Sequence, residues 1–295
     1  MDLRAAKLAA GNTVSVCLPA RDEEATIGAI VEEIQARLGG PDGLVDEIVV
    51  VDDGSLDGTG AVARAAGARV VAEREILPEA GPGSGKGNAL WKSLHECTGD
   101  LVCWIDADLR NFEAHFVTRL LEPLLTQPDI CFVKAYYHRS YEGSPTGGGR
   151  VTELVARPVL SLLFPKLADI VQPLGGEYAG RRDALEVLPF VEGWGVELGL
   201  LIDIIDRFGR DAVAQVDLGV REHRNRPLDE LSPQAMAVLL TALRRAGVPD
   251  ERLSHTLVRY GMDKQSATVD VETRERPPML TVPSYRAKFG RELTA

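Results

Sequence analysis

The chain has 295 residues, with 33 lysines and arginines against 44 aspartates and glutamates, and so a formal net charge of −11. This length exceeds that of a disulfide or zinc mini-domain, and a composition of 45% hydrophobic and 26% charged residues excludes wholesale disorder. The negative charge argues against non-specific nucleic-acid binding, because phosphate contacts require a basic face. Any anionic ligand must therefore be held by a local concentration of arginine and lysine.

Neither a membrane span nor a disulfide framework is predicted. Uncharged apolar runs stay shorter than the roughly 18 residues that cross a bilayer. Three of the four cysteines, Cys17, Cys103 and Cys131, lie inside apolar runs of strand length, as reduced core thiols do. We therefore expect a cytoplasmic globular protein.

In the first half, apolar runs of strand length alternate with segments of helical period. We expect strands at 14–18, 48–51, 69–72, 101–105 and 130–135, and helices at 27–38, 57–66, 87–97 and 113–125. Valine-rich runs alternating with helices are typical of a parallel sheet covered on both faces. The predicted fold class is therefore α/β, with a doubly wound, mostly parallel sheet.

The second half has a less regular pattern. Helices are predicted at 147–164 and 196–208, with a strand at 212–217. A further helix is expected to start at Ser232 as N-cap, with Pro233 in its first turn, and to end at Gly247. From Lys264 onward the chain is polar and proline-bearing, which predicts an extended or partly ordered tail.

Carboxylates follow two of the predicted strands. Asp52 and Asp53 end the second strand, and Asp106 and Asp108 end the fourth, so both pairs reach the sheet edge where open α/β proteins bind ligands. The alternative for Asp52 and Asp53 is a solvated turn with an Asx hydrogen bond. Asp-x-Asp oxygens suit Mg²⁺ or Mn²⁺ bound together with substrate phosphates. The turn at 19–24 contains no glycine, which argues against dinucleotide binding.

Three further segments suggest anion binding. The run 81–87 fails as a P-loop, because Gly87 stands where Ser or Thr is required, and it is expected to present Lys86 on a flexible loop. Gly149, Arg150 and Thr152 lie at a predicted helix N-terminus, and 221–226 contains three arginines and His223. The alternatives are a surface loop, a glycine linker and, for His223 alone, a core or surface histidine.

Together these motifs resemble the nucleotide-diphospho-sugar domain of A-type glycosyltransferases. The runs 82–91, 147–158, 172–178 and 218–227 resemble, more specifically, the glucosyl-3-phosphoglycerate synthases of glycosyltransferase family 81, which include a mannosyl variant. The resemblance covers residues 14 to 262. It implies a retaining transfer of a hexose from UDP-glucose, GDP-glucose or GDP-mannose to 3-phosphoglycerate, by a homodimer that uses Mg²⁺ or Mn²⁺.

The resemblance also assigns roles to residues. Those implied for the nucleotide sugar are Pro19, Ala20, Glu23, Asp53, Lys86, Asp106, Leu174, Gly175 and Glu197. Those implied for the acceptor are Gly149, Arg150, Thr152 and Asn225, and those for the metal are Asp108 and His223. The implied catalytic set is Asp106, Asp108, Glu197, Arg221 and His223.

The resemblance divides the chain into three parts: a nucleotide-sugar half at 12–135, an acceptor half of the same catalytic domain at 136–228, and a C-terminal helix and tail at 229–295. The chain departs from similar glucosyl enzymes in having Asp53 where a serine is frequent and Trp194 where a tyrosine is common. These changes leave the donor base and the hexose open. The alternative functions are an inverting transferase of the same fold and a non-catalytic sugar-nucleotide-binding protein.

Overall fold

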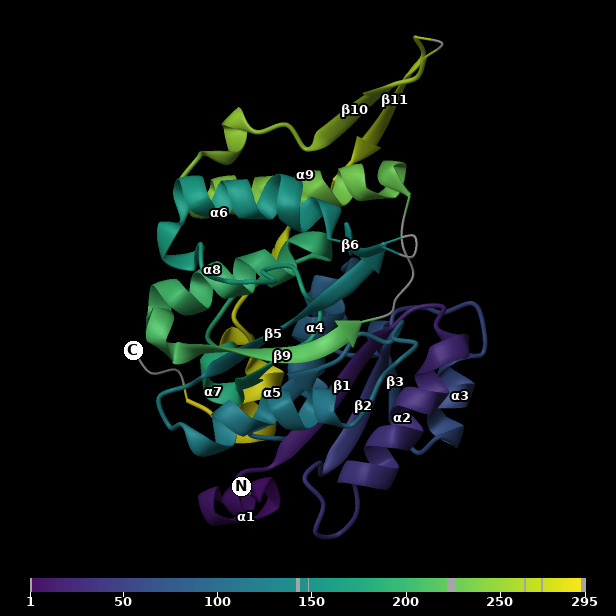
Figure 1. Cartoon of the computed structure of the whole chain (residues 1–295), viewed down its shortest axis with the longest axis vertical. Helices are drawn as coiled ribbons and strands as arrows, with labels where there is room; N and C mark the ends of the chain where they lie inside the picture. Colours follow the sequence, from purple (N-terminus) through teal and green to yellow (C-terminus); the bar gives the residue numbers. More distant parts are fainter. Residues whose placement is uncertain are drawn as a thin grey trace.

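The computed structural model describes residues 2–141, 144–147, 149–221, 227–262, 264–271 and 273–292. Its centre is an eight-stranded sheet in the order β3-β2-β1-β4-β7-β5-β6, with β9 paired to β5 (Figure 1). The strands are β1 (Val14–Ala20), β2 (Glu47–Asp52), β3 (Arg69–Ala72), β4 (Leu101–Trp104), β5 (Phe132–Tyr141), β6 (Ser144–Gly147), β7 (Tyr178–Arg181) and β9 (Val213–Arg221). β1 to β4 are mutually parallel, whereas β7 runs antiparallel between β4 and β5. The predicted α/β class is confirmed.

Helices cover both faces of this sheet. The helices are α1 (Leu3–Ala10), α2 (Glu24–Leu38), α3 (Thr59–Ala65), α4 (Gly85–Glu96), α5 (His115–Thr126), α6 (Arg157–Leu163), α7 (Arg182–Leu185), α8 (Val196–Phe208), α9 (Leu228–Arg245) and α10 (Pro283–Phe289). Alternate residues of each strand enter different cores: Val16 and Val50 pack with α2 and α5, whereas Cys17 and Val51 pack with α4 and α8. The strand period thus explains why these runs are continuously apolar.

Between these elements lie short 3₁₀ turns and one π-helical turn. The 3₁₀ turns are Glu73–Glu75, Pro78–Ala80, Pro165–Leu167, Gly193–Gly195, Arg210–Ala212, Asp250–Arg252 and Met279–Thr281. The π-helical turn, Thr152–Ala156, continues directly into α6, so the helix predicted at 147–164 is largely present. The boundary expected between residues 135 and 136 falls inside β5, so both predicted halves share one sheet. In the described part of the chain, no helix is long and apolar enough to cross a membrane.

The predicted start of the last long helix is wrong. α9 begins at Leu228 with Pro227 as its N-cap, and Pro233 lies inside the helix. Asp229 and Glu230 occupy the first turn, where negative charge stabilises the helix dipole. The Ser232 hydroxyl donates a hydrogen bond back to the Leu228 carbonyl instead of capping a new helix.

The prediction of an extended C-terminal tail is also wrong. β10 (Thr256–Tyr260) and β11 (Ser266–Asp270) form a projecting hairpin, and β12 (Glu275–Arg276) pairs with β8 (Phe190–Val191) (Figure 1). The following segment packs Met279 and Tyr285 into the core beside α4 and α8, with both side chains fully buried. The apolar residues that anchor it recur at helical spacing from Met279 to Phe289, a pattern that polar and proline residues obscure.

Candidate functional site

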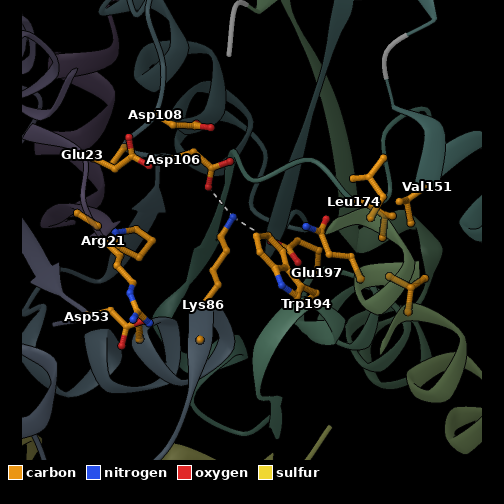
Figure 2. Close-up of a pocket in the computed structure, with 18 of the residues that line it drawn as sticks. Arg21, Glu23, Asp53, Lys86, Asp106, Asp108, Val151, Leu174, Trp194 and Glu197 are labelled. Atoms are coloured by element: carbon orange, nitrogen blue, oxygen red, sulfur yellow. Dashed lines mark hydrogen bonds and ion pairs between the residues drawn. The ribbon is translucent and has the colours of Figure 1, made fainter. Parts of the chain in front are cut away.

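A cavity of about 600 Å³ opens at the carboxyl ends of β1, β2 and β4 (Figure 2). It brings together thirteen of the predicted site residues: Pro19, Ala20, Glu23, Asp53, Lys86, Asp106, Asp108, Gly149, Arg150, Thr152, Leu174, Glu197 and Arg221. Gly175 lies just outside this lining. His223 and Asn225 lie outside the described residues, directly after the end of β9. Residues from both halves of the chain therefore line one site.

One end of the cavity is formed by the turns after β1 and β2. Asp22 adopts the left-handed conformation with φ +56°, and its carboxylate accepts a hydrogen bond of 2.7 Å from the Leu56 backbone N–H. Glycine is the usual residue in this conformation, but aspartate also tolerates it when its side chain makes a local hydrogen bond. Asp52 accepts from the Ser55 N–H at 2.9 Å, whereas Asp53 faces the cavity. The Asx turn is therefore present at Asp52, whereas a ligand contact at Asp53 stays a prediction.

Asp53 lies in an unfavourable environment for a carboxylate. Burial raises its pKa, and the nearby carboxylate of Glu73 raises it further, while the charge of Arg21 partly offsets both effects. Figure 2 shows the Arg21 side chain directed towards Asp53. A group at this position that donates a hydrogen bond would stabilise the ionised carboxylate. Asp53 is therefore suited to accept from an N–H of a ligand.

Lys86 is the central cation of the site. Its ammonium lies 2.5 Å from Asp106 Oδ1 and 2.9 Å from Glu197 Oε1 (Figure 2). Burial alone would lower the pKa of Lys86, but the two carboxylates outweigh burial and raise this pKa well above its usual value. The expected flexible loop is wrong here, because Lys86 belongs to the first turn of α4. The helix fixes the backbone of Lys86, and the ion pairs fix its ammonium group.

Arg221 holds the other side of the aspartate pair. Its Nη2 lies 2.7 Å from Asp106 Oδ2, 3.1 Å from Asp108 Oδ1 and 3.0 Å from Glu177 Oε1. Its Nη1 donates to the Tyr137 hydroxyl at 3.3 Å. With Lys86 on one oxygen and Arg221 on the other, Asp106 is neutralised from both sides and fixed in orientation. The Asp108 side chain, at 31% against 20% for Asp106, is the more exposed of the two.

A glycine pair allows this close packing. A Cβ at Gly176 would overlap the Asp106 carboxylate, so only glycine lets the backbone pass there. The carbonyl of the preceding Gly175 accepts from the ammonium of Lys134. Lys134 is fully buried, and burial lowers its pKa to about 7, although the charge of Glu197 opposes the shift.

The opposite end of the cavity is formed by the start of the α6 helical run and by α9. Gly149, with φ +75°, precedes Arg150, and the Gly149 carbonyl accepts from the Glu153 N–H at 3.0 Å. Leu231, Gln234 and Val238 contribute one face of α9. Sequence reasoning missed this face, although its spacing of three and four residues marks one side of a helix. It also missed Lys134, which lies in an apolar strand, and Glu177, which lies in the run 172–178 but received no role.

The donor groups of the site fit a divalent cation. Six acidic side chains against four basic ones line the cavity within the described residues, and both Lys86 and Arg221 already pair with carboxylates. A polyphosphate entering this lining needs additional positive charge. Asp108 supplies the hard oxygen ligand that Mg²⁺ and Mn²⁺ prefer. The residues that the structure describes contain no cluster of three His, Cys, Asp or Glu that could hold a metal ion.

Comparison with known proteins connects this geometry to a family. The family model "Glycosyl transferase family 2" matches residues 15–187. A glucosyl-3-phosphoglycerate synthase of Mycolicibacterium smegmatis is 50% identical over 286 residues, which cover 95% of this chain and 93% of the relative. The enzyme of the same name from Petrotoga mobilis is 44% identical over 291 residues, covering 95% and 90%.

Solved structures of the same enzyme family are also similar to this chain. A crystal structure of glucosyl-3-phosphoglycerate synthase from Mycobacterium tuberculosis, in complex with Mn²⁺, UDP-glucose and phosphoglyceric acid, superimposes with a TM-score of 0.86. It is 50% identical and covers 94% of this chain and 93% of its own. A second structure of that protein contains Mn²⁺, UDP and glucosyl-3-phosphoglycerate, with a TM-score of 0.85.

Proposed function

The chain belongs to the glucosyl-3-phosphoglycerate synthase family, and from this premise we propose that it transfers glucose from UDP-glucose to 3-phosphoglycerate. One observation carries the proposal: the Asp106–Asp108 pair, its two cations and the Arg150 loop line a single cavity. We assign the Asp106–Asp108 side of this cavity to a diphosphate sugar and the Arg150 loop to a second anion. A binding protein for a sugar nucleotide alone would not need the second place.

The reaction breaks the bond between the anomeric carbon and the β-phosphate oxygen and forms a bond from that carbon to the acceptor hydroxyl. When bound, a divalent cation neutralises the departing diphosphate. Asp108 and His223 would hold this cation. Lys86 adds fixed positive charge beside Asp106, where it need not reorganise as charge develops on the leaving group.

We infer retention of configuration by attack from the face that the diphosphate leaves. In this mechanism the hydroxyl proton passes to the departing phosphate oxygen, so the protein needs no separate base. Glu197, one carboxylate candidate for a covalent intermediate, lies 2.9 Å from the Lys86 ammonium. Glu197 is therefore assigned to a sugar hydroxyl, which donates a hydrogen bond to such a carboxylate.

The acceptor is assigned to the Gly149–Thr152 end. Arg150 supplies a planar cation that binds phosphate or carboxylate with two parallel hydrogen bonds, and Thr152 adds a hydroxyl. The donor base is assigned to the end formed by Pro19, Ala20 and Asp53. An Asp53 carboxylate accepts from uracil N–H and also from a guanine edge, so we expect a preference for UDP over GDP of tens-fold rather than thousands-fold.

The test is a product assay with purified protein, Mn²⁺ and 3-phosphoglycerate. UDP-glucose, GDP-glucose, UDP-mannose and GDP-mannose are supplied in parallel, and the glycosylated acid is identified by mass spectrometry. We expect product from UDP-glucose with an α-anomeric proton in the NMR spectrum. A β-anomer would disprove retention, and nucleotide release without glycosylated acid would disprove the acceptor.

We also propose a homodimer in the cytoplasm. The β10–β11 hairpin projects from the body and exposes Val258, Tyr260 and Met262, an apolar surface suited to a second copy (Figure 1). All four cysteines are free thiols, as the reducing cytoplasm favours. Sedimentation equilibrium should give twice the chain mass for the wild type and a shift towards the chain mass for Tyr260→Glu. A wild type that sediments as a monomer would refute the assembly.

A further inference from the structure

Three segments that are far apart in the chain meet behind the Lys86 end of the cavity. The Gly193 N–H donates to the Ser84 carbonyl at 3.3 Å, which joins the start of α4 to the turn before α8. A Cβ on Gly87 would overlap the Val191 carbonyl, so α4 lies directly against β8. From the C-terminal region, β12 pairs with β8 and places Arg276 opposite Phe190.

Arg276 connects all three segments through one guanidinium group. Its Nε lies 2.9 Å from Asn88 Oδ1 and 2.8 Å from Glu192 Oε1. Its Nη1 donates to the Ala80 carbonyl at 2.8 Å, and its Nη2 donates to the Gly81 carbonyl at 3.3 Å. Only 7% of Arg276 is exposed, so these contacts are shielded from water.

The segments that Arg276 holds carry cavity residues at their ends. The loop at 80–85 leads into the helical turn of Lys86, and it includes Gly81 and Gly85, both at positive φ. Glycines make this backbone permissive, so an external contact is needed to select one conformation. Glu192 precedes Trp194 and Glu197, both of which line the cavity. The Arg276 side chain thus fixes both the segment that leads to Lys86 and the segment that leads to Glu197.

We infer that Arg276 is a positioning residue for the donor: it touches no lining of the cavity but sets the distance between Lys86 and Glu197. This inference rests on the proposed function, because it assumes that this pair faces the nucleotide sugar. The geometry requires arginine. Lysine would keep the charge, but its single nitrogen would not reach two carbonyls, an amide oxygen and a carboxylate in a planar fork.

The chain offers two matched controls. Arg274 lies two residues away on the same segment, with its side chain 64% exposed and its Nη2 3.8 Å from Glu192 Oε2. Arg182 is as buried as Arg276 and donates to the Gly99, Leu94 and Cys97 carbonyls, away from the cavity. Arg274→Met controls for charge on the segment, and Arg182→Lys controls for the loss of a buried guanidinium group.

The experiment compares Arg276→Lys with both controls by steady-state kinetics, thermal unfolding and hydrogen exchange. We expect Arg276→Lys to raise the KM for UDP-glucose about tenfold while the KM for 3-phosphoglycerate changes less than twofold. Amide exchange should accelerate across 80–88 and 190–197. Arg182→Lys should lower the melting temperature without raising the donor KM, and Arg274→Met should change neither quantity.

Two results would overturn the inference: an unchanged donor KM in Arg276→Lys, or an equal rise in both KM values. If Arg276→Lys does not fold, Glu192→Gln removes one arm of the same contact and must show the same selective rise in donor KM. Calorimetry of UDP-glucose with Mn²⁺ separates the two proposals. A wild type that does not bind the donor refutes the proposed function, whereas equal binding by wild type and variant refutes the role of Arg276.

Discussion

Replacing Lys86 by methionine would remove the cation between Asp106 and Glu197 while keeping the length of the side chain. The ammonium makes two charge-assisted contacts, at 2.5 and 2.9 Å, and the Glu197 side chain is only 6% exposed. Hydrogen bonds to charged groups contribute about 1.5–3 kcal/mol each, and breaking a buried pair costs about 3–5 kcal/mol. We therefore expect the free energy of unfolding to fall by about 3–5 kcal/mol at pH 7.

The corresponding shift in melting temperature follows from chain length. At about 2.1 cal/mol/K per residue, the unfolding entropy of a chain this long is about 0.6 kcal/mol/K, so the melting temperature should fall by about 5–8 °C. The loss should shrink in Lys86→Met/Glu197→Gln, which leaves only Asp106, still paired with Arg221.

Urea unfolding of the wild type, Lys86→Met, Glu197→Gln and the double variant at pH 7 measures these differences. Arg37→Met is the control, because its side chain is 71% exposed and its ion pair with Glu33 should contribute no more than about 1 kcal/mol. A Lys86→Met loss that is below 1 kcal/mol, or unchanged by Glu197→Gln, would refute this interpretation of the site.

Four further predictions follow from single residues. Asp108→Ala should reduce the rate of glucosyl transfer at least ~100-fold and abolish the Mn²⁺ binding that calorimetry detects in the presence of UDP. A metal chelator should abolish transfer by the wild type. Arg150→Ala should raise the acceptor KM about 10–150-fold and leave the donor KM within twofold, since a charge-assisted contact contributes about 1.5–3 kcal/mol. Burial lowers the pKa of Lys134 to about 7, so between pH 7 and pH 10.5 the native state binds fewer protons than the unfolded chain. The free energy of unfolding should therefore rise with pH over that range. Denaturant unfolding of Lys134→Met should show a smaller rise. The hydrogen bond with His95 lowers the pKa of Glu96 to about 2, so this carboxylate stabilises the fold above pH 4.5 and loses the effect towards pH 2. In denaturant unfolding, Glu96→Gln should be less stable than the wild type at pH 6 and as stable as the wild type at pH 2.

The sequence predicted the elements that local pattern determines. The helix at 196–208 and the strand at 69–72 were predicted with the bounds that the structure has, because apolar periodicity and terminal glycines mark them. The start of α9 was not, because Ser232–Pro233 is a stronger local signal than Pro227. Here the acidic first turn and the packing of the helix against α8 prevail over capping preference.

In the site, too, the features that local pattern determines were predicted, and those that depend on tertiary packing were not. Asp53, Asp106 and Asp108 were predicted to share one edge because parallel strands end together. The ion pairs of Lys86 with Asp106 and Glu197 were not predicted, since α4 and α8 meet only through tertiary packing. Buried charges such as Lys134 leave no periodic trace in sequence, because a long polar side chain in an apolar strand looks like an interruption.

The C-terminal segment also has a consequence for synthesis on the ribosome. The indole N–H of Trp91, in α4, donates to the Pro277 carbonyl at 2.7 Å, across 186 positions of the chain. At ~5–20 residues per second, this partner is translated about 10–40 s after the tryptophan. For most of that interval the nascent chain contains both aspartate pairs, yet the helix that carries Lys86 lacks its final support. A chain terminated before Pro277 would contain all of the described cavity residues and still lack the contacts that close the fold behind them.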